Sequence, residues 1–151
     1  MVHPQYIELR NQALAYQSDQ TNSQSHTIKL CLADWHRDNG IVTLVLVDDG
    51  SVSLYFSNGS SILGCGKYAS VQQSAGELMQ EAEQFLQEAY EVDQAELPNT
   101  GEIQFYFKHN SVLSRLSGGN NPAMAPASVI RLFEVMNGVI ADIREASEGK
   151  N

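Results

Sequence analysis

The pattern of hydrophobic and polar positions in the middle of the chain predicts a three-stranded β-meander that leads into a helix. Ile41–Val47 is an apolar, β-branched run, Val52–Phe56 is a second strand-like segment, and Ile62–Leu63 begins a third. The dipeptides Asp49-Gly50 and Asn58-Gly59 separate them and favour tight type I′ turns, whose two central residues need positive φ. Because Ile41–Val47 is apolar on both faces, we expect it in the middle of a sheet that is covered on both sides.

Three other segments have hydrophobic residues at helical spacing. The first runs from His3 to about Gln20, with Pro4 at a favourable first position. The second runs from Ser70 to about Glu91 and opens with a capping-box pattern, Ser70 followed by Gln73. The third, Ala127–Ala146, carries a continuous apolar stripe. These patterns predict three amphipathic helices.

Alternating segments predict the remaining strands. Thr27–Ala33 has the alternation of a half-buried strand, and Ile103–Lys108 carries one aromatic face. Ser111–Leu116 follows as the second arm of a hairpin. Residues 18–26 form a polar loop, and the glycine-rich stretch 117–126 is expected to be a flexible loop.

The resulting element order, αββββαββα, predicts an α+β fold in which an antiparallel sheet of about five or six strands packs against three helices gathered on one side. We expect residues 1–151 to form one domain. The element order is loosely similar to the profilin-like layout of roadblock and longin modules. That resemblance implies two helices that frame an antiparallel sheet, with a crossing helix between its halves.

Composition narrows the classes of partner. The chain has 18 acidic and nine basic residues, for a net charge of −9, and such a surface repels nucleic acids and anionic membranes. It has neither a leader-like N-terminus nor an apolar run of about 20 residues, so we expect a soluble cytoplasmic protein. Cys31 and Cys65 stand in apolar contexts that favour two buried free thiols, although a single disulfide is also possible.

The segment Gly64-Cys65-Gly66-Lys67-Tyr68-Ala69 matches the G-x-G-x-x-A pattern of dinucleotide sites. Its preceding strand belongs to antiparallel hairpins and not to a βαβ unit, so we interpret it as a glycine-containing turn between strand and helix and expect no cofactor. A helix start and Lys67 would both lower the pKa of Cys65, so a reactive thiolate is an alternative to a structural thiol.

The polar segment Asp34-Trp35-His36-Arg37-Asp38-Asn39 is interpreted as a loop around the only tryptophan. Trp35 and Arg37 are residue types that dominate binding hot spots, and with His36 they form a candidate partner-binding surface. Asp34, His36 and Asp38 would suit a metal or acid–base site. We expect partner binding rather than catalysis here, with no resident metal.

A second candidate surface is acidic. Residues 68–107 contain no lysine or arginine and eight acidic residues, of which Glu77, Glu81, Glu88 and Glu91 recur at helical spacings. Such a face suits a basic partner, or it is only the solvated side of an amphipathic helix.

Two hypotheses on function follow. The first is a non-catalytic protein-interaction or regulatory module that binds a protein partner, such as a basic one, or a second copy of itself. The candidate contact residues are Trp35, His36, Arg37, Glu77, Glu81 and Glu88. The second is a small-molecule-binding protein or enzyme with a pocket between the 34–38 loop and the 117–126 loop. Asp34, His36 and His109 would supply its polar groups, and it requires that they converge.

Overall fold

The computed structural model describes residues 2–16, 28–109, 111–118 and 125–148. The predicted loop 18–26 and most of the loop 117–126 lie outside these residues. The first helix was predicted to continue to about Gln20, and that prediction is wrong, because the helix ends at Leu14. In chain order the elements are α1 (Pro4–Leu14), β1 (Leu30–Arg37), β2 (Gly40–Val47), β3 (Val52–Phe56), β4 (Ser61–Ile62), the 3₁₀ turn η1 (Cys65–Lys67), α2 (Ala69–Gln84), the 3₁₀ turn η2 (Leu86–Glu88), β5 (Tyr90–Glu91), β6 (Ile103–His109), β7 (Val112–Ser117) and α3 (Ala127–Ser147). The predicted α+β class and its order of elements are confirmed.

The strands form one antiparallel sheet, which has seven strands within the described residues, more than the five or six expected. Their order across the sheet is β4-β3-β2-β1-β6-β7-β5. β1 lies at the centre, with Trp35 opposite Val42 of β2 on one side and opposite Ile103 of β6 on the other. The unexpected strand is β5, a two-residue strand that pairs with β7 at one edge.

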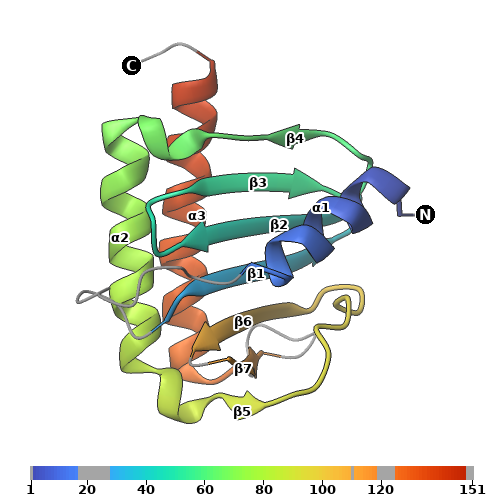
Figure 1. Ribbon diagram of the computed structural model, residues 1–151, viewed down its shortest axis with the longest axis vertical. Helices are drawn as coiled ribbons and strands as arrows, with labels where there is room; N and C mark the ends of the chain where they lie inside the picture. Colours follow the sequence, from blue (N-terminus) through green and yellow to red (C-terminus); the bar gives the residue numbers. More distant parts are fainter. Residues whose placement is uncertain (1, 17–27, 110, 119–124, 149–151) are drawn as a thin grey trace.

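Helices cover both faces of the sheet (Figure 1). α2 and α3 pack side by side on one face, over a core that includes Cys31, Ala33 and Phe105. α1 lies on the opposite face, over a second core that includes Leu32 and Tyr106. The prediction that all helices gather on one side is therefore wrong for α1, whereas the expected two-sided cover of Ile41–Val47, now β2, is confirmed, because its side chains enter both cores. Successive residues of β1 point to opposite faces, so both faces need an apolar cover.

The two hairpin turns differ from the predicted type I′. Val47 N–H donates to Ser51 O and Gly50 N–H donates to Val47 O, both at 3.0 Å, and Gly50 has a φ of 91°. The second turn repeats this pattern with Phe56, Ser60 and Gly59. Among the described non-glycine residues only Ser111 has positive φ, so neither Asp49 nor Asn58 meets the type I′ requirement. Both are three-residue loops that end in a left-handed glycine, the arrangement of a G1 bulge.

Helix ends also differ from the predictions. The side chain of His3 caps α1, since its Nδ1 accepts the Gln5 N–H at 3.0 Å. α2 begins after Tyr68 without a side-chain cap, and Ser70 lies inside the helix, so the predicted capping box is absent. α3 matches its prediction to within a residue. None of the helices in the described residues combines the length and apolarity that crossing a bilayer requires.

Candidate functional site

The clearest candidate site is an apolar row that crosses four strands at one end of the sheet. Trp35 of β1 lies opposite Val42 of β2, and Val42 lies opposite Phe56 of β3. Ile62 of β4 continues the row, because its partner is Leu54, two residues before Phe56. The segment 34–37 was predicted as a loop, and that prediction is wrong: it is the last part of β1 and is paired on both sides over residues 34 and 35. The strand pairing therefore holds Trp35 in place.

α3 forms the second wall of this site. Its C-terminal half faces the apolar row with Ile140 and Ala141, and together they enclose a groove of about 550 Å³. Phe133 of α3 packs against Trp35, whose ring it meets edge-on with centroids 4.8 Å apart. In Figure 1 the strands extend beyond α3 on the right, where α1 lies over the opposite face of the sheet. We call this site the Trp35 groove; it is lined by Trp35, Arg37, Val42, Phe56, Ile62, Asn137, Ile140, Ala141, Arg144, Ser147 and Glu148.

Two arginines flank the Trp35 groove. The Arg37 guanidinium lies over the Trp35 ring, 4.9 Å from its centroid, in a cation–π contact. Arg144 lies on α3, and both arginines are exposed. The groove also contains one carboxylate, that of Glu148. It adjoins a smaller hollow of about 150 Å³, which shares Arg37, Val42 and Phe56 with it and is also lined by Asn39, Ile41, Ser57 and Asn58. An apolar floor with a cationic rim can hold an apolar group and an anionic group together.

The predicted group of Asp34, His36 and His109 does not come together. His36 lies at one end of β1, where its Nδ1 is 3.0 Å from the Pro98 carbonyl oxygen. His109 ends β6 at the opposite end of the strand pair, and its Nε2 is 3.0 Å from Ser114 Oγ. The alternation along the paired strands also turns the two histidines to opposite faces of the sheet. The hypothesis of a pocket therefore loses the polar groups on which it was based. Within the described residues, no three His, Cys, Asp or Glu side chains are placed to hold a metal ion.

Asp34 is fully buried and belongs to a polar network beneath α1. It pairs with Arg10 of α1, which is 3% exposed, and it accepts hydrogen bonds from Thr43 Oγ1 at 2.6 Å and Gln104 Nε2 at 2.9 Å. Because Thr43 gives its only hydroxyl proton to Asp34, the Tyr6 hydroxyl, 2.7 Å away, donates to Thr43. Sequence reasoning missed this network, since its members lie far apart along the chain.

The same network fastens the segment that follows β5. Arg10 Nη1 donates to the carbonyl oxygen of Ala95 at 2.8 Å, and the Gln104 side chain and the Tyr106 hydroxyl both donate to that of Glu96, also at 2.8 Å. Within the described residues, every buried side-chain nitrogen or oxygen has a hydrogen-bond partner. We therefore assign the network to stability and not to catalysis.

A neighbouring cluster around Arg115 also has its polar groups engaged. Arg115 donates to Gln104, Tyr90 and Glu102, at 2.7–2.9 Å, beside a hollow of about 510 Å³. Burial opposes ionisation of Glu102, but hydrogen bonds from the Asn99 backbone and Ser117 and the charge of Arg115 outweigh it and lower the pKa of Glu102. Each of the three guanidinium nitrogens of Arg115 thus donates a hydrogen bond within the chain, and the cluster anchors the edge of the sheet.

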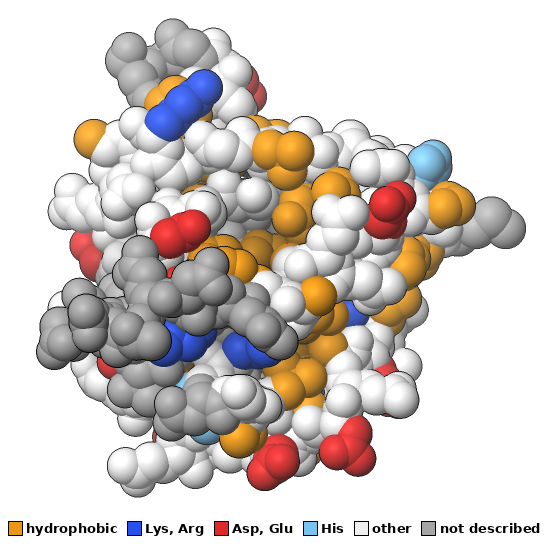
Figure 2. Space-filling model, viewed as in Figure 1, with side chains coloured by type: hydrophobic (Ala, Val, Ile, Leu, Met, Phe, Trp, Pro, Cys, Tyr) orange, Lys and Arg blue, Asp and Glu red, His pale blue; other side chains and the backbone are white. Residues whose placement is uncertain are grey.

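The four glutamates predicted to share one side of the second helix do not all lie on that helix. α2 ends at Gln84, so Glu88 lies in η2 and Glu91 in β5. Glu81 accepts a hydrogen bond from Arg131 Nε of α3 at 3.0 Å, and Glu88 accepts one from Ser128 Oγ at 2.7 Å. Glu77 remains exposed on α2. Figure 2 shows the acidic side chains scattered over the face that carries α1, rather than gathered in a patch.

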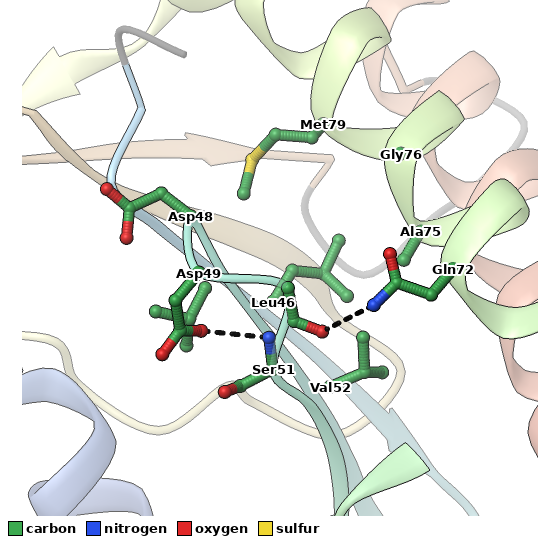
Figure 3. Close-up of a pocket in the computed structure, with 11 residues that line it drawn as sticks. Leu46, Asp48, Asp49, Ser51, Val52, Gln72, Ala75, Gly76 and Met79 are labelled. Carbon is green, nitrogen blue, oxygen red and sulfur yellow. Dashed lines mark hydrogen bonds between the residues drawn. The ribbon is translucent and has the colours of Figure 1, made fainter. Parts of the chain in front are cut away.

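The glycine elbow at residues 64–66 is explained by packing. Gly66 lies against the β2–β3 turn, where a Cβ atom would overlap the carbonyl oxygen of Gly50. Gln72 of α2 donates to the same oxygen at 3.2 Å, as Figure 3 shows, and Asp49 accepts the Ser51 N–H at 2.9 Å. The remaining hollow between this turn and α2 is about 290 Å³. The close contact accounts for Gly66 without a nucleotide.

Both cysteines are free thiols buried in the core below α2 and α3. Burial raises the pKa of Cys31 to about 12, and it also raises the pKa of Cys65 despite the opposing charge of Lys67. Cys65 Sγ lies 3.4 Å from the carbonyl oxygen of Ile62. The disulfide and the reactive thiolate considered from the sequence are both contradicted.

The buried Cys31 thiol predicts a loss of stability at alkaline pH. Its pKa is raised from 9.0 to about 12, so its stabilising effect is complete below pH 9 and is lost as the pH rises toward 12. At about 1.4 kcal/mol per pH unit, Cys31 should contribute roughly 2 kcal/mol less at pH 10.5 than at pH 8. Urea unfolding at both pH values measures this. A Cys31→Ala variant should show a shallower decline, and equal declines in the two proteins would contradict the assignment.

No family model matches the chain, and neither a curated protein nor a solved structure matches it.

Proposed function

We propose that this protein is a non-catalytic interaction module that binds an apolar segment of a partner protein in the Trp35 groove. The observation that supports this most is the row formed by Trp35, Val42 and Phe56, which remains open beside the C-terminal half of α3. Apolar contact area with a tryptophan at its centre and arginines at its rim is typical of interface hot spots.

The size of the groove suits one or two bulky side chains of the partner. A volume of about 550 Å³ lies in the range of sites that enclose a small ligand or an anchoring group. Burial of one such side chain is worth about 1.5–3 kcal/mol, and the aromatic contacts of Trp35 add to this. These values suit a partner segment that docks reversibly.

The enzyme alternative has less support. It requires polar groups that converge on a pocket, and the residues first considered for that role are separated or hydrogen-bonded within the chain, as His36 is to Pro98 and Asp34 is to Arg10. The proposal of an acidic docking face also has less support, because Glu81 and Glu88 accept hydrogen bonds from Arg131 and Ser128 of α3. Of the residues predicted to bind a partner, Trp35 and Arg37 are the two that line the groove.

A peptide-display selection against the intact chain tests the proposal. The chain contains one tryptophan, so a bound peptide without tryptophan should change the emission of Trp35. We expect Ala141→Gln, which places a larger polar side chain on the exposed groove wall, to weaken such peptides about tenfold or more. Ala127→Gln, at an exposed position at the other end of α3, should change affinity less than twofold.

The proposal is overturned if the selection yields no peptides, or if the selected peptides bind Ala141→Gln as tightly as the unmodified chain and leave Trp35 emission unchanged. Self-association through the groove would appear instead as a concentration-dependent mass that Ala141→Gln lowers, and it would replace the partner segment by a second copy.

A further inference from the structure

We infer that the segment bound in the Trp35 groove carries an aspartate or glutamate next to its apolar anchor, and that Arg37 and Arg144 bind this carboxylate. This inference rests on the proposed function and specifies the chemistry of the partner. Its support comes from the distribution of charge among the described residues.

Most basic side chains of the described residues are already engaged within the chain. Four of them pair with carboxylates, and Lys108 donates to the carbonyl oxygens of Leu14 and Tyr16. The four pairs are Arg10–Asp34, Lys29–Asp48, Arg115–Glu102 and Arg131–Glu81. Three described bases have no ion-pair partner among the described residues: Arg37, Lys67 and Arg144. Two of the three line the Trp35 groove.

This placement is unexpected in a chain with twice as many acidic as basic residues. Surface arginines in such a chain have many carboxylates available, yet these two lie on an apolar groove whose lining includes one carboxylate, Glu148, against two guanidinium groups. Charges beyond about 8 Å are largely screened at physiological salt, so the local arginines and not the net charge of −9 determine what the groove attracts. A partner carboxylate complements them.

The geometry of Arg37 favours a carboxylate over a mere counterion. Its contact with the Trp35 ring orients the planar guanidinium and leaves the N–H groups at its edge for a bidentate bond. Arg37 also lies where the groove adjoins the smaller hollow, whose lining includes the amide side chains of Asn39 and Asn58. A segment with its apolar side chain over Trp35 would therefore bring an adjacent acidic residue to Arg37.

Matched peptides test this inference separately from the proposed function. Peptides obtained from the display selection are synthesised in two forms, with each Asp or Glu retained or replaced by Asn or Gln. We expect the acidic form to bind about 3–10-fold more tightly to the unmodified chain, and Arg37→Gln or Arg144→Gln to remove most of this preference. Lys67→Gln changes the third base that has no ion-pair partner within the described part of the chain. Lys67 lies outside the groove lining, so this variant should preserve the preference.

Equal affinity of the acidic and amide forms for the unmodified chain overturns the inference, and so does a preference that survives in the Arg37→Gln and Arg144→Gln variants. If both forms bind equally and Ala141→Gln still abolishes binding, the proposed function stands and only the acidic character of the partner is wrong. If neither form depends on Ala141 and neither changes the emission of Trp35, both proposals fail.

Discussion

The Asp34→Ala variant is expected to lose about 3–5 kcal/mol of unfolding free energy, the largest effect of any single substitution proposed for this protein. The change leaves Arg10, 3% exposed, without the carboxylate that balances its charge. It also removes the acceptor of hydrogen bonds from Thr43 and Gln104, both buried. Urea unfolding, followed by far-UV circular dichroism, measures the loss.

Two controls separate the charge from the packing. Asp34→Asn keeps the shape of the side chain and one acceptor oxygen but leaves the Arg10 charge unbalanced, so we expect most of the loss to remain. In a double-mutant cycle, Arg10→Met added to Asp34→Leu should cost less than the sum of the single changes, because neither polar partner is then left buried alone. Additive single effects, or an Asp34→Ala loss below about 1 kcal/mol, would contradict the role assigned to this pair.

The Gly66→Ala variant is the second strongly destabilising change, with an expected loss of about 1–3 kcal/mol. Gly66 does not have positive φ, so its requirement for glycine is one of space. The added methyl group overlaps the Gly50 carbonyl oxygen, which is backbone and is held by Gln72 from α2. Relief of the overlap would require the β2–β3 turn to move away from α2. Thermal and urea unfolding measure the effect.

Gly138→Ala and Gly76→Ala are the matched controls for Gly66→Ala. Both glycines lie at exposed positions inside helices, and nothing within 4 Å would meet an added Cβ atom. The space around Gly138 shows that this glycine does not mark a close contact between helices. Each control should therefore stabilise the fold by about 0.4–1 kcal/mol. If Gly66→Ala is as stable as these variants, the packing explanation of the glycine elbow is wrong.

The sequence predicted elements well where local periodicity and burial agree. α3 and β3 match their predicted bounds closely, because an unbroken stripe or alternation is bounded by polar residues. α2 was overextended, because Phe85, Leu86 and Ala89 continue the apolar stripe and still pack on the core although the helix has ended at Gln84. The periodic pattern indicates which residues face the core but not where the helix ends. Leu86 of η2 still faces the core and is partly buried.

The predictions failed where distant residues decide the outcome. The segment from Asp34 to Arg37 was predicted to be a loop because it is polar, yet Asp34 is buried by Arg10 and Gln104, which are 24 and 70 residues away. The groove also depends on residues that are distant in the sequence. Pairing with β2 fixes the position of Trp35, and Trp35 can then contact Phe133 of α3. Likewise, an amphipathic stripe on α1 shows that one face is buried but not which face of the sheet it covers.

The two outer strands have a consequence for the behaviour of the chain at high concentration. β4 and β5, which terminate the sheet on either side, are two residues long. An edge this short exposes few unpaired backbone groups to a neighbouring molecule, and short edges are one way in which proteins avoid strand-to-strand polymerisation. A sheet with such edges offers a poor template for fibril growth, so molecules that crowd together while folded should resist joining through their backbones.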